Sequence, residues 1–396
     1  MYFTIFMNEA RGEENKVKIA LDASCLVLNP SSGLAEVARN LVDHLPLVTQ
    51  HHSYSLFMNY FRKSAATAVP SSFDEETNIL RMPRRIVDWW WRRNWPSLDM
   101  YVRGVDVFHG LHIQVPPTRK IRTVLTVHDC RYLALPTLYP EEEVKTYREQ
   151  MTRSLRRADQ IGADSEFTRQ ELLSYFSLPE ERVKVIHNGF RPWTPHTAHW
   201  EKKVQQFLEE QMIPQPYLLY LGVLDPRKNI LNLIEALARC KEKRRDFPDL
   251  LLVGIVRDQW MNSKEARRAR ELRVFDCIHI AGVLEKDLAW GLTKKSLALC
   301  YPSLYEGFGF PPLEAMSVGV PVLAGRSSSI PEVTGDAACL VDPFNVEEMA
   351  EGLNRIVSDS SYRHILTQAG YQRVKFFSWK KTVEQYISLY HEAANS

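Results

Sequence analysis

Two glutamates lie on either side of a loop of glycine, aromatic and proline residues in the stretch 305–316 (YEGFGFPPLEAM). The first is Glu306 and the second is Glu314. A carboxylate only accepts hydrogen bonds, which suits the vicinal hydroxyls of a hexose or a ribose. The spacing therefore predicts two carboxylates that contact different parts of one ligand. A solvated loop residue, followed by a first-turn acid that complements a helix dipole, would give the same pattern.

The loop between the glutamates has the composition of a ligand-binding turn that leads into a helix. Gly307 and Gly309 allow the backbone to approach a ligand closely, and we expect Phe308 and Phe310 to line the same site. The next two residues are prolines, which fix the backbone where a first helical turn begins. The free N–H groups of that turn can face an anion, so the loop predicts a sugar and phosphate site.

Two predicted strands enclose this loop. Residues 296–303 (SLALCYPS) read as a buried strand, and residues 320–324 (VPVLA) read as the next one. In an open parallel sheet, ligands bind beyond the carboxyl ends of the strands, which is where this order places Glu306.

A pair of cations follows another apolar strand, at 216–222, that ends in Gly222. Arg227 and Lys228 precede an amphipathic run that starts at Ile230, so the sequence predicts two cations at a helix start. Unpaired cations at a helix N-terminus interact unfavourably with the helix dipole, which destabilises the helix by roughly 0.3–1 kcal/mol. A bound diphosphate would remove that conflict, whereas the plain alternative is a pair of solvated charges.

The ordered set of Glu306, Glu314, Gly319-Val320-Pro321-Val322 and Ser329-Ile330-Pro331-Glu332-Val333 resembles the retaining nucleotide-sugar glycosyltransferases of family 4. The resemblance implies an α/β fold of the GT-B type, with two Rossmann-like doubly wound domains that face a cleft. It also implies roles for single residues. Arg227 and Lys228 would bind the donor phosphates and neutralise the leaving diphosphate, Gly222 would permit close approach, Glu306 would hold sugar hydroxyls, and Glu314 would hold the ribose.

The first half of the chain carries a predicted catalytic histidine. His128 ends the predicted strand 123–128, and by resemblance it lies near the reacting sugar. The alternative for His128 is a structural role in the core. For His109 and His112, the structural role and a role in the site fit the sequence equally well. Gly33 opens a predicted helix where family members often carry two glycines, so a plain helix start and a substrate contact both fit this position.

The length of 396 residues and the alternation of strands and helices predict two domains. We expect an acceptor-side domain at residues 1–195 and a nucleotide-sugar-binding domain at residues 196–375. By resemblance, the helix at residues 376–396 crosses back onto the first domain.

Composition narrows the class of partner and the compartment. A net charge of +2, from 50 basic and 48 acidic side chains, argues against nucleic-acid binding. Six cysteines without metal-ligand spacing read as reduced thiols of a cytoplasmic protein, and residues 1–7 make a poor signal peptide. No apolar run is long enough to span a membrane. The basic and aromatic segment 84–95 (RRIVDWWWRRNW) fits a packing helix and a peripheral membrane contact equally well.

We therefore expect transfer of a hexose from a nucleoside-diphosphate sugar to a saccharide or lipid-linked saccharide in polysaccharide or lipopolysaccharide biosynthesis. The resemblance favours mannose from GDP-mannose, catalysed by His128, Glu306, Arg227 and Lys228 without a metal or other cofactor. The alternatives are a catalytically silent nucleotide-binding subunit and a nucleotide-sugar epimerase or phosphorylase on the same fold. A dehydrogenase is disfavoured, since no G-x-G-x-x-G opens a first helix.

Overall fold

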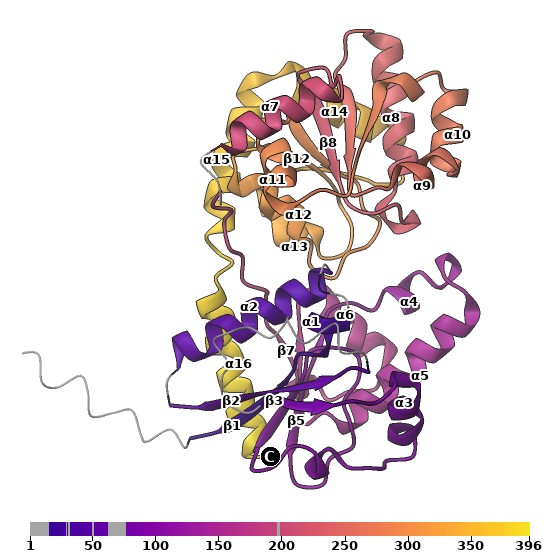
Figure 1. Cartoon of the computed structure of the whole chain (residues 1–396). Coiled ribbons are helices and arrows are strands. Elements are labelled where there is room, and N and C mark those ends of the chain that lie inside the picture. Colours follow the sequence, from indigo (N-terminus) through magenta and orange to yellow (C-terminus); the bar gives the residue numbers. More distant parts are fainter. Residues whose placement is uncertain (1–15, 29, 31, 50, 62–76, 196–198) are drawn as a thin grey trace, which may run out of the picture.

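Two parallel sheets, each with helices packed around it, form two lobes (Figure 1). The computed structural model describes residues 16–28, 30, 32–49, 51–61, 77–195 and 199–396. Two doubly wound α/β domains are confirmed. Residues 1–7 and residues 196–198, beside the predicted boundary at 195/196, lie outside the described residues, and that boundary stays a prediction.

The first sheet has the strand order β3-β2-β1-β4-β5-β6-β7, and every neighbouring pair is parallel. Its strands are apolar because helices cover both faces of the sheet, as a parallel sheet requires. The strands are β1 (Lys18–Asp22), β2 (Ser53–Asn59), β3 (Thr77–Leu80), β4 (Val107–Gly110), β5 (Arg122–Val127), β6 (Gln160–Ala163) and β7 (Val183–Val185), and the helices are α1 (Ser24–Leu28), α2 (Gly33–Val48), α3 (Arg84–Arg92), α4 (Arg131–Ala134), α5 (Glu141–Arg157) and α6 (Glu166–Tyr175).

The second sheet has the order β10-β9-β8-β11-β12-β13, again with parallel pairs. The strand order reverses between β8 and β11, and such a switch point is where open α/β sheets bind ligands. The strands are β8 (Tyr217–Leu221), β9 (Asp249–Val253), β10 (Ile278–Gly282), β11 (Ala298–Tyr301), β12 (Val322–Gly325) and β13 (Cys339–Val341), and the helices are α7 (Trp200–Glu210), α8 (Ile230–Lys243), α9 (Arg257–Met261), α10 (Lys264–Glu271), α11 (Lys286–Lys295), α12 (Phe310–Ser317), α13 (Ile330–Thr334), α14 (Val346–Ser358) and α15 (Ser360–Val374).

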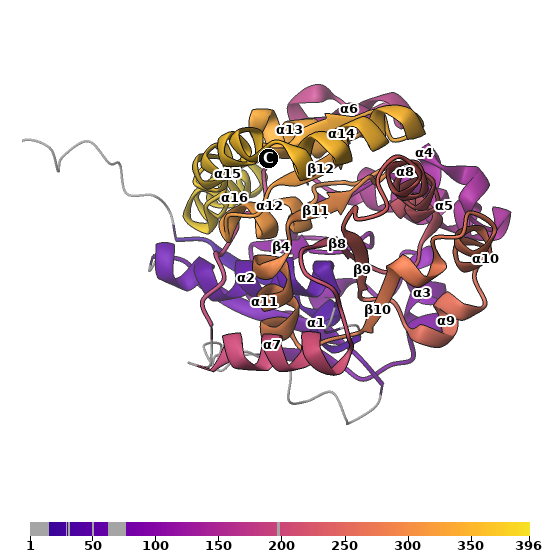
Figure 2. The same ribbon diagram turned by 90° about the horizontal axis from the view of Figure 1, so that it is seen from above.

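The last helix, α16 (Trp379–Ala394), leaves the second lobe and packs on the first one (Figures 1 and 2). Its apolar face joins the core around β1 and α2, in which Trp379 and Tyr390 are buried. Ser378 stands at the N-cap position of this helix but makes no side-chain capping bond. Burial of the aromatic face, rather than a cap, therefore fixes this helix on the first domain.

The segment 84–95 is a helix, α3, for most of its length, and Val87 and Trp91 on it are buried. The membrane contact stays a prediction. Trp91 is buried in the core beneath the helix, whereas Trp89 is 53% exposed and Trp95 is 56% exposed. None of the described helices is long and apolar enough to cross a membrane.

Candidate active site

The cations and the first carboxylate meet at the switch point of the second sheet. Arg227 and Lys228 lie in a short 3-10 turn (Pro226–Lys228) that follows β8, and Glu306 lies in the loop that follows β11. Because β8 and β11 are neighbours, their carboxyl ends bring the two loops side by side. The helix begins at Ile230 as predicted. The cations precede α8, whose N-cap is Asn229 in a left-handed conformation with φ 59°.

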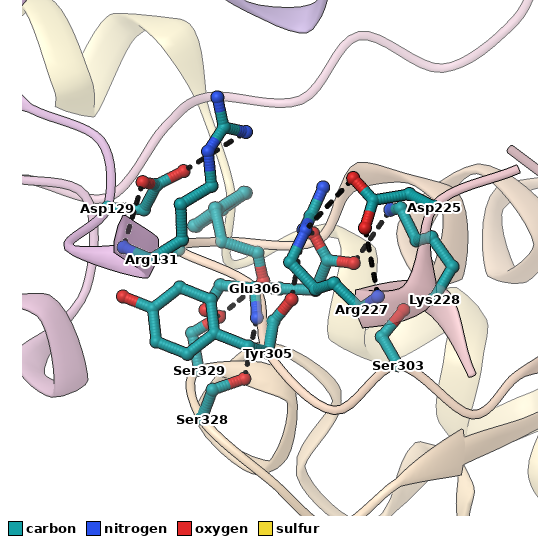
Figure 3. A network of polar contacts seen from close by, with 12 residues as sticks. Asp129, Arg131, Asp225, Arg227, Lys228, Ser303, Tyr305, Glu306, Ser328 and Ser329 are labelled. Carbon is teal, nitrogen blue, oxygen red and sulfur yellow. Dashed lines mark hydrogen bonds and ion pairs between the residues drawn. The ribbon is translucent and has the colours of Figure 1, made fainter. Parts of the chain in front are cut away.

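Glu306 bridges both cations (Figure 3). Arg227 Nη1 donates to Glu306 Oε2 at 2.8 Å, and Lys228 Nζ donates to Glu306 Oε1 at 2.7 Å. The same Nη1 reaches the carbonyl of Tyr305 at 2.9 Å, and Lys228 also donates to the Tyr301 hydroxyl at 2.8 Å. Each of the three charged residues is only 8% exposed. A buried carboxylate thus resolves the charge conflict that the sequence assigned to a bound diphosphate.

The electrostatics of this cluster keep all its members charged. Burial opposes ionisation of Glu306, but Lys228 and then Arg227 outweigh it and lower the pKa of the carboxyl to about 2. Burial lowers the pKa of Lys228, although Glu306 opposes that shift. Glu306 and Asp225 hold the pKa of Arg227 above its ordinary value in spite of burial. The cluster carries one net positive charge when Asp225 is left out of the count.

The hydrogen bonding of Arg227 is incomplete. Its Nε is buried and has no hydrogen-bond partner among the described residues, and Asp225 Oδ2 lies 3.9 Å from it. The Ser303 side chain interacts with Glu306 and helps to lower the pKa of that carboxyl. Buried donors are normally satisfied, so the unpaired Nε of Arg227 is unusual.

The loop that contains Gly307 and Gly309 forms part of the contact between the two domains and also leads into α12. A Cβ on Gly307 would lie 1.8 Å from the carbonyl oxygen of His128, so the two lobes touch here by backbone. Gly309 has φ +106° and is the N-cap of α12. Phe308 is buried and packs against Phe310 and Phe377, with ring centroids 5.1 and 5.4 Å apart. The structure thus places both aromatic residues in interdomain packing.

Glu314 lies apart from the cations. It is the fifth residue of α12, beyond the predicted first turn, and its carboxylate makes no hydrogen bond or ion pair with any described residue. Burial, and then the charge of Glu36 from the other domain, raise the pKa of Glu314 to about 7. Lys286 lowers it and also pairs with Glu36 across the domains at 2.6 Å. Glu36 belongs to the helix that Gly33 opens, so this helix start faces the second domain.

His128 follows β5 and is bonded at both ring nitrogens. Nδ1 lies 2.7 Å from Asp164 Oδ2, and Nε2 lies 3.1 Å from the carbonyl oxygen of Leu111. Both partners are acceptors, so both nitrogens must donate, and an imidazole does so only when it is protonated. Burial lowers the pKa of His128, but Asp164 outweighs burial and raises it above the ordinary value. This bonding pattern and the raised pKa favour the imidazolium form of His128.

The other two histidines differ from His128. His109 is buried, bonds the Tyr390 hydroxyl and Thr126 Oγ1 at 2.7 Å each, and is neutral because burial lowers its pKa to about 3. It joins β4 to α16 and has a structural role. Burial and the charge of Arg84 lower the pKa of His112 to about 3 as well.

Comparison with known proteins gives the same organisation. The family model described as "Glycosyl transferases group 1" matches residues 202–373, and the one described as "Glycosyltransferase Family 4" matches residues 31–192. The chain is 32% identical over 292 residues to the O-antigen chain mannosyltransferase B of Escherichia coli, which covers 72% of this chain and 74% of that protein. The chain therefore belongs to the glycosyltransferase family that includes this mannosyltransferase.

One further relative and one solved structure are also similar to this chain. The serotype-specific mannosyltransferase WbdA of Escherichia coli is 28% identical over 228 residues, or 57% of this chain and 28% of that longer protein. WaaG, a glycosyltransferase involved in lipopolysaccharide biosynthesis, has the same fold, with a TM-score of 0.68 at 17% identity over 94% of this chain and 99% of WaaG. The predicted GT-B fold is confirmed.

The roles of three polar residues of this glycosyltransferase were not predicted from the sequence. Asp164 follows β6, the strand beside β5, and strand order alone could have paired it with His128. Glu332 of the second domain accepts the N–H groups of Glu166 and Phe167 at 2.8 and 3.2 Å, and so caps a helix of the first domain. Arg131 lies beside the Tyr305–Glu306 loop. Finding the last two required the placement of the domains.

β8 ends at Leu221, one residue before the predicted end, and the N–H of the following Gly222 donates to the carbonyl of Val253 at 2.9 Å. Gly33 opens α2 next to the capping residue Ser32, and a Cβ there would meet nothing within 4 Å. Packing thus does not require glycine at position 33. No group of three or more histidine, cysteine, aspartate or glutamate side chains in the described ranges is arranged to hold a metal ion. Metal independence stays a prediction.

Proposed function

We propose that this glycosyltransferase transfers mannose from GDP-mannose, with retention, to a saccharide or lipid-linked saccharide during surface-polysaccharide synthesis. The observation that carries the proposal is the buried pair of cations at the switch point, one of which has an unsatisfied Nε. The mannosyltransferase relatives support the choice of sugar. The choice of base follows the resemblance of the chain to that branch of the family.

The donor diphosphate is proposed to bind beside Arg227. Nη1 of the guanidinium already donates hydrogen bonds to Glu306 and to the carbonyl of Tyr305. These bonds fix the plane of the guanidinium before any ligand binds. The diphosphate is proposed to reach the remaining donors of this guanidinium, and donors that are fixed in advance act most strongly on charge that grows in the transition state. Glu306 keeps the two cations apart and in place, in addition to the contact with sugar hydroxyls that the resemblance implies.

The state of His128 limits its role in the reaction. An imidazolium whose two N–H groups bond Asp164 and Leu111 cannot accept the proton of the acceptor hydroxyl. We assign that proton to an oxygen of the leaving diphosphate. The bond from the anomeric carbon to phosphate breaks while the acceptor oxygen bonds the same face, and the positive charge of His128 stabilises the departing anion. This sequence leaves the anomeric configuration unchanged.

A lipid-linked acceptor is compatible with the surface of α3. Trp89 and Trp95 are exposed, Arg85 and Arg92 flank them, and the Arg93 guanidinium carbon lies 4.1 Å from the centroid of the Trp89 ring. Exposed tryptophans among arginines suit the boundary of an anionic membrane. We propose that this helix rests on the membrane that carries the acceptor.

A transfer assay tests the proposed reaction. GDP-mannose, UDP-glucose, UDP-N-acetylglucosamine and dTDP-rhamnose are each incubated with lipid-linked saccharide acceptors, and the new linkage is read by NMR. Selective use of GDP-mannose with an α-linked product supports the proposal. A β-linked product contradicts retention, and use of another donor contradicts the choice of sugar. Nucleotide binding without any transfer would favour the silent subunit.

Vesicle co-sedimentation tests the membrane contact separately. Binding to vesicles with anionic phosphatidylglycerol is expected to exceed binding to pure phosphatidylcholine, and Trp89→Ala with Trp95→Ala is expected to weaken it. Substitution of Phe344, which is 71% exposed on the second domain, serves as the control for loss of an exposed aromatic side chain. Equal binding by the tryptophan variant and the Phe344→Ala control contradicts the contact.

A further inference from the structure

Arg131 of the first domain lies where the two domains touch. It follows Cys130, whose N–H donates to the Tyr305 hydroxyl at 2.8 Å. Two residues further along the second-domain loop, Gly307 meets the backbone of His128. The segment 128–131 therefore packs directly on the loop whose Glu306 holds Arg227. Figure 3 shows Arg131 and Arg227 rising from the two sides of this loop.

The two arginines share the same incomplete bonding. Arg131 Nε, like Arg227 Nε, is buried without a hydrogen-bond partner among the described residues. Arg131 Nη1 lies 3.9 Å from Asp129 Oδ2, the same separation as between Arg227 Nε and Asp225 Oδ2. Both distances are too long for a hydrogen bond. Each guanidinium thus has a carboxylate nearby and retains hydrogen-bond donors for a further acceptor.

The charges indicate an anion as that acceptor. Burial opposes the charge on Arg131, Asp129 raises its pKa above the ordinary value, and Arg227 acts in the opposite direction, so the two guanidiniums repel each other. Tyr139, whose buried hydroxyl also lacks a partner, experiences the charges of both arginines and of Asp225. An anion placed among these groups would relieve the repulsion between the two guanidiniums and accept hydrogen bonds from their unused donors.

We infer that Arg131 is a further donor-binding residue, which contacts the β-phosphate of the nucleoside diphosphate from the side opposite to Arg227. The inference rests on the proposed function, because it takes Arg227 as the other phosphate ligand. It gives the first domain a direct part in holding the leaving group, beside the imidazolium of His128. The bound diphosphate would then form charged contacts with both domains, with Arg131 of the first and Arg227 of the second.

Calorimetric titration of the whole protein with GDP and with GMP tests this contact. Arg131→Ala is expected to weaken GDP binding about tenfold, as for loss of a charged hydrogen bond. GMP lacks the β-phosphate, so its affinity is expected to change by less than about twofold. Arg131→Lys keeps the charge without the planar fork, and an intermediate GDP affinity is expected. Arg148→Ala, which removes an exposed arginine from α5, is the matched control.

The outcomes separate this inference from the proposed function. Weaker GDP binding by both Arg131→Ala and Arg227→Ala, with Arg148→Ala unchanged, supports the inference. Weaker binding by Arg227→Ala alone overturns it and leaves the donor site standing. Equal losses for GDP and GMP in Arg131→Ala overturn it in favour of a structural role. A raised KM for the acceptor with unchanged GDP affinity overturns it in favour of an acceptor contact. Unchanged GDP affinity in Arg227→Ala removes the donor site itself.

Discussion

Replacement of Glu306 by glutamine removes the only carboxylate that accepts hydrogen bonds from both Arg227 and Lys228 in the described part of the chain. The amide keeps the shape of the side chain but not its charge. Two buried cations are left next to each other without compensation. Loss of one partner from a buried ion pair costs about 3–5 kcal/mol of the free energy of unfolding.

The expected change in melting temperature follows from the size of the domain. A change of 1 kcal/mol shifts the melting temperature of a unit of 150–250 residues by about 2–4 °C. Glu306→Gln is therefore expected to lower the transition of the second domain by about 6–20 °C at pH 7. Glu347 is a matched control because it also pairs with two cations, Arg239 and Lys243, but is 43% exposed. Its replacement by glutamine is expected to lower the melting temperature far less, because exposed ion pairs contribute little to stability.

Differential scanning calorimetry of the wild type and both variants, with and without GDP, is the assay. GDP is expected to raise the melting temperature of Glu306→Gln more than that of the wild type, because the diphosphate supplies the missing negative charge. The pKa of Glu306 is depressed to about 2, so its contribution is present above the unfolded value near 4.5 and is lost as the pH falls toward 2. The gap between the variant and the wild type must therefore narrow below about pH 4.5. Equal losses for Glu306→Gln and Glu347→Gln would refute the reasoning.

Three other changes have defined outcomes. Gly307→Ala places a Cβ against the His128 carbonyl, so turnover is expected to fall at least about tenfold while GDP affinity, measured by calorimetry, stays within about twofold; full turnover would contradict the domain contact. Asp164→Asn removes the group that raises the pKa of His128, so the fall in transfer rate at alkaline pH is expected to move to lower pH, and an unmoved pH–rate profile would exclude the imidazolium. Glu314 has its pKa raised to about 7, so it takes up a proton on folding between about pH 4.5 and 7, and the wild type loses stability as the pH rises through this range, by at most about 1.4 kcal/mol per pH unit. Glu314→Gln is expected to flatten that dependence in urea unfolding at pH 5, 6 and 7.5, and an unchanged slope would show that Glu314 is solvated.

The location of the site could be predicted from the sequence because it depends on strand order. Apolar runs before Arg227 and before Glu306 identified two strands, and parallel strands present their carboxyl ends at one edge. Glu306 and Arg227 are 79 positions apart, and no local pattern shows which carboxylate faces a given cation. The ion cluster therefore became visible only when side-chain positions were known.

Long-range packing explains the remaining differences. His109 bonds Tyr390, which lies 281 positions away, so its structural role depends on where the last helix docks. Glu332 caps a helix of the other domain, which requires the relative placement of both domains. Motifs describe one loop and its neighbours, whereas these contacts join residues from opposite ends of the chain.

Binding of GDP-mannose to the wild type and to the Arg227→Ala, Lys228→Ala double variant addresses the donor site itself. Titration calorimetry is run at a temperature where both proteins are folded, with Arg239→Ala, Lys243→Ala as the control that removes two exposed cations around Glu347. Loss of two charged hydrogen bonds predicts at least about a hundredfold weaker binding by the first variant and wild-type affinity for the control. Equal affinity for GDP-mannose in all three proteins would contradict the assignment of these cations to the donor.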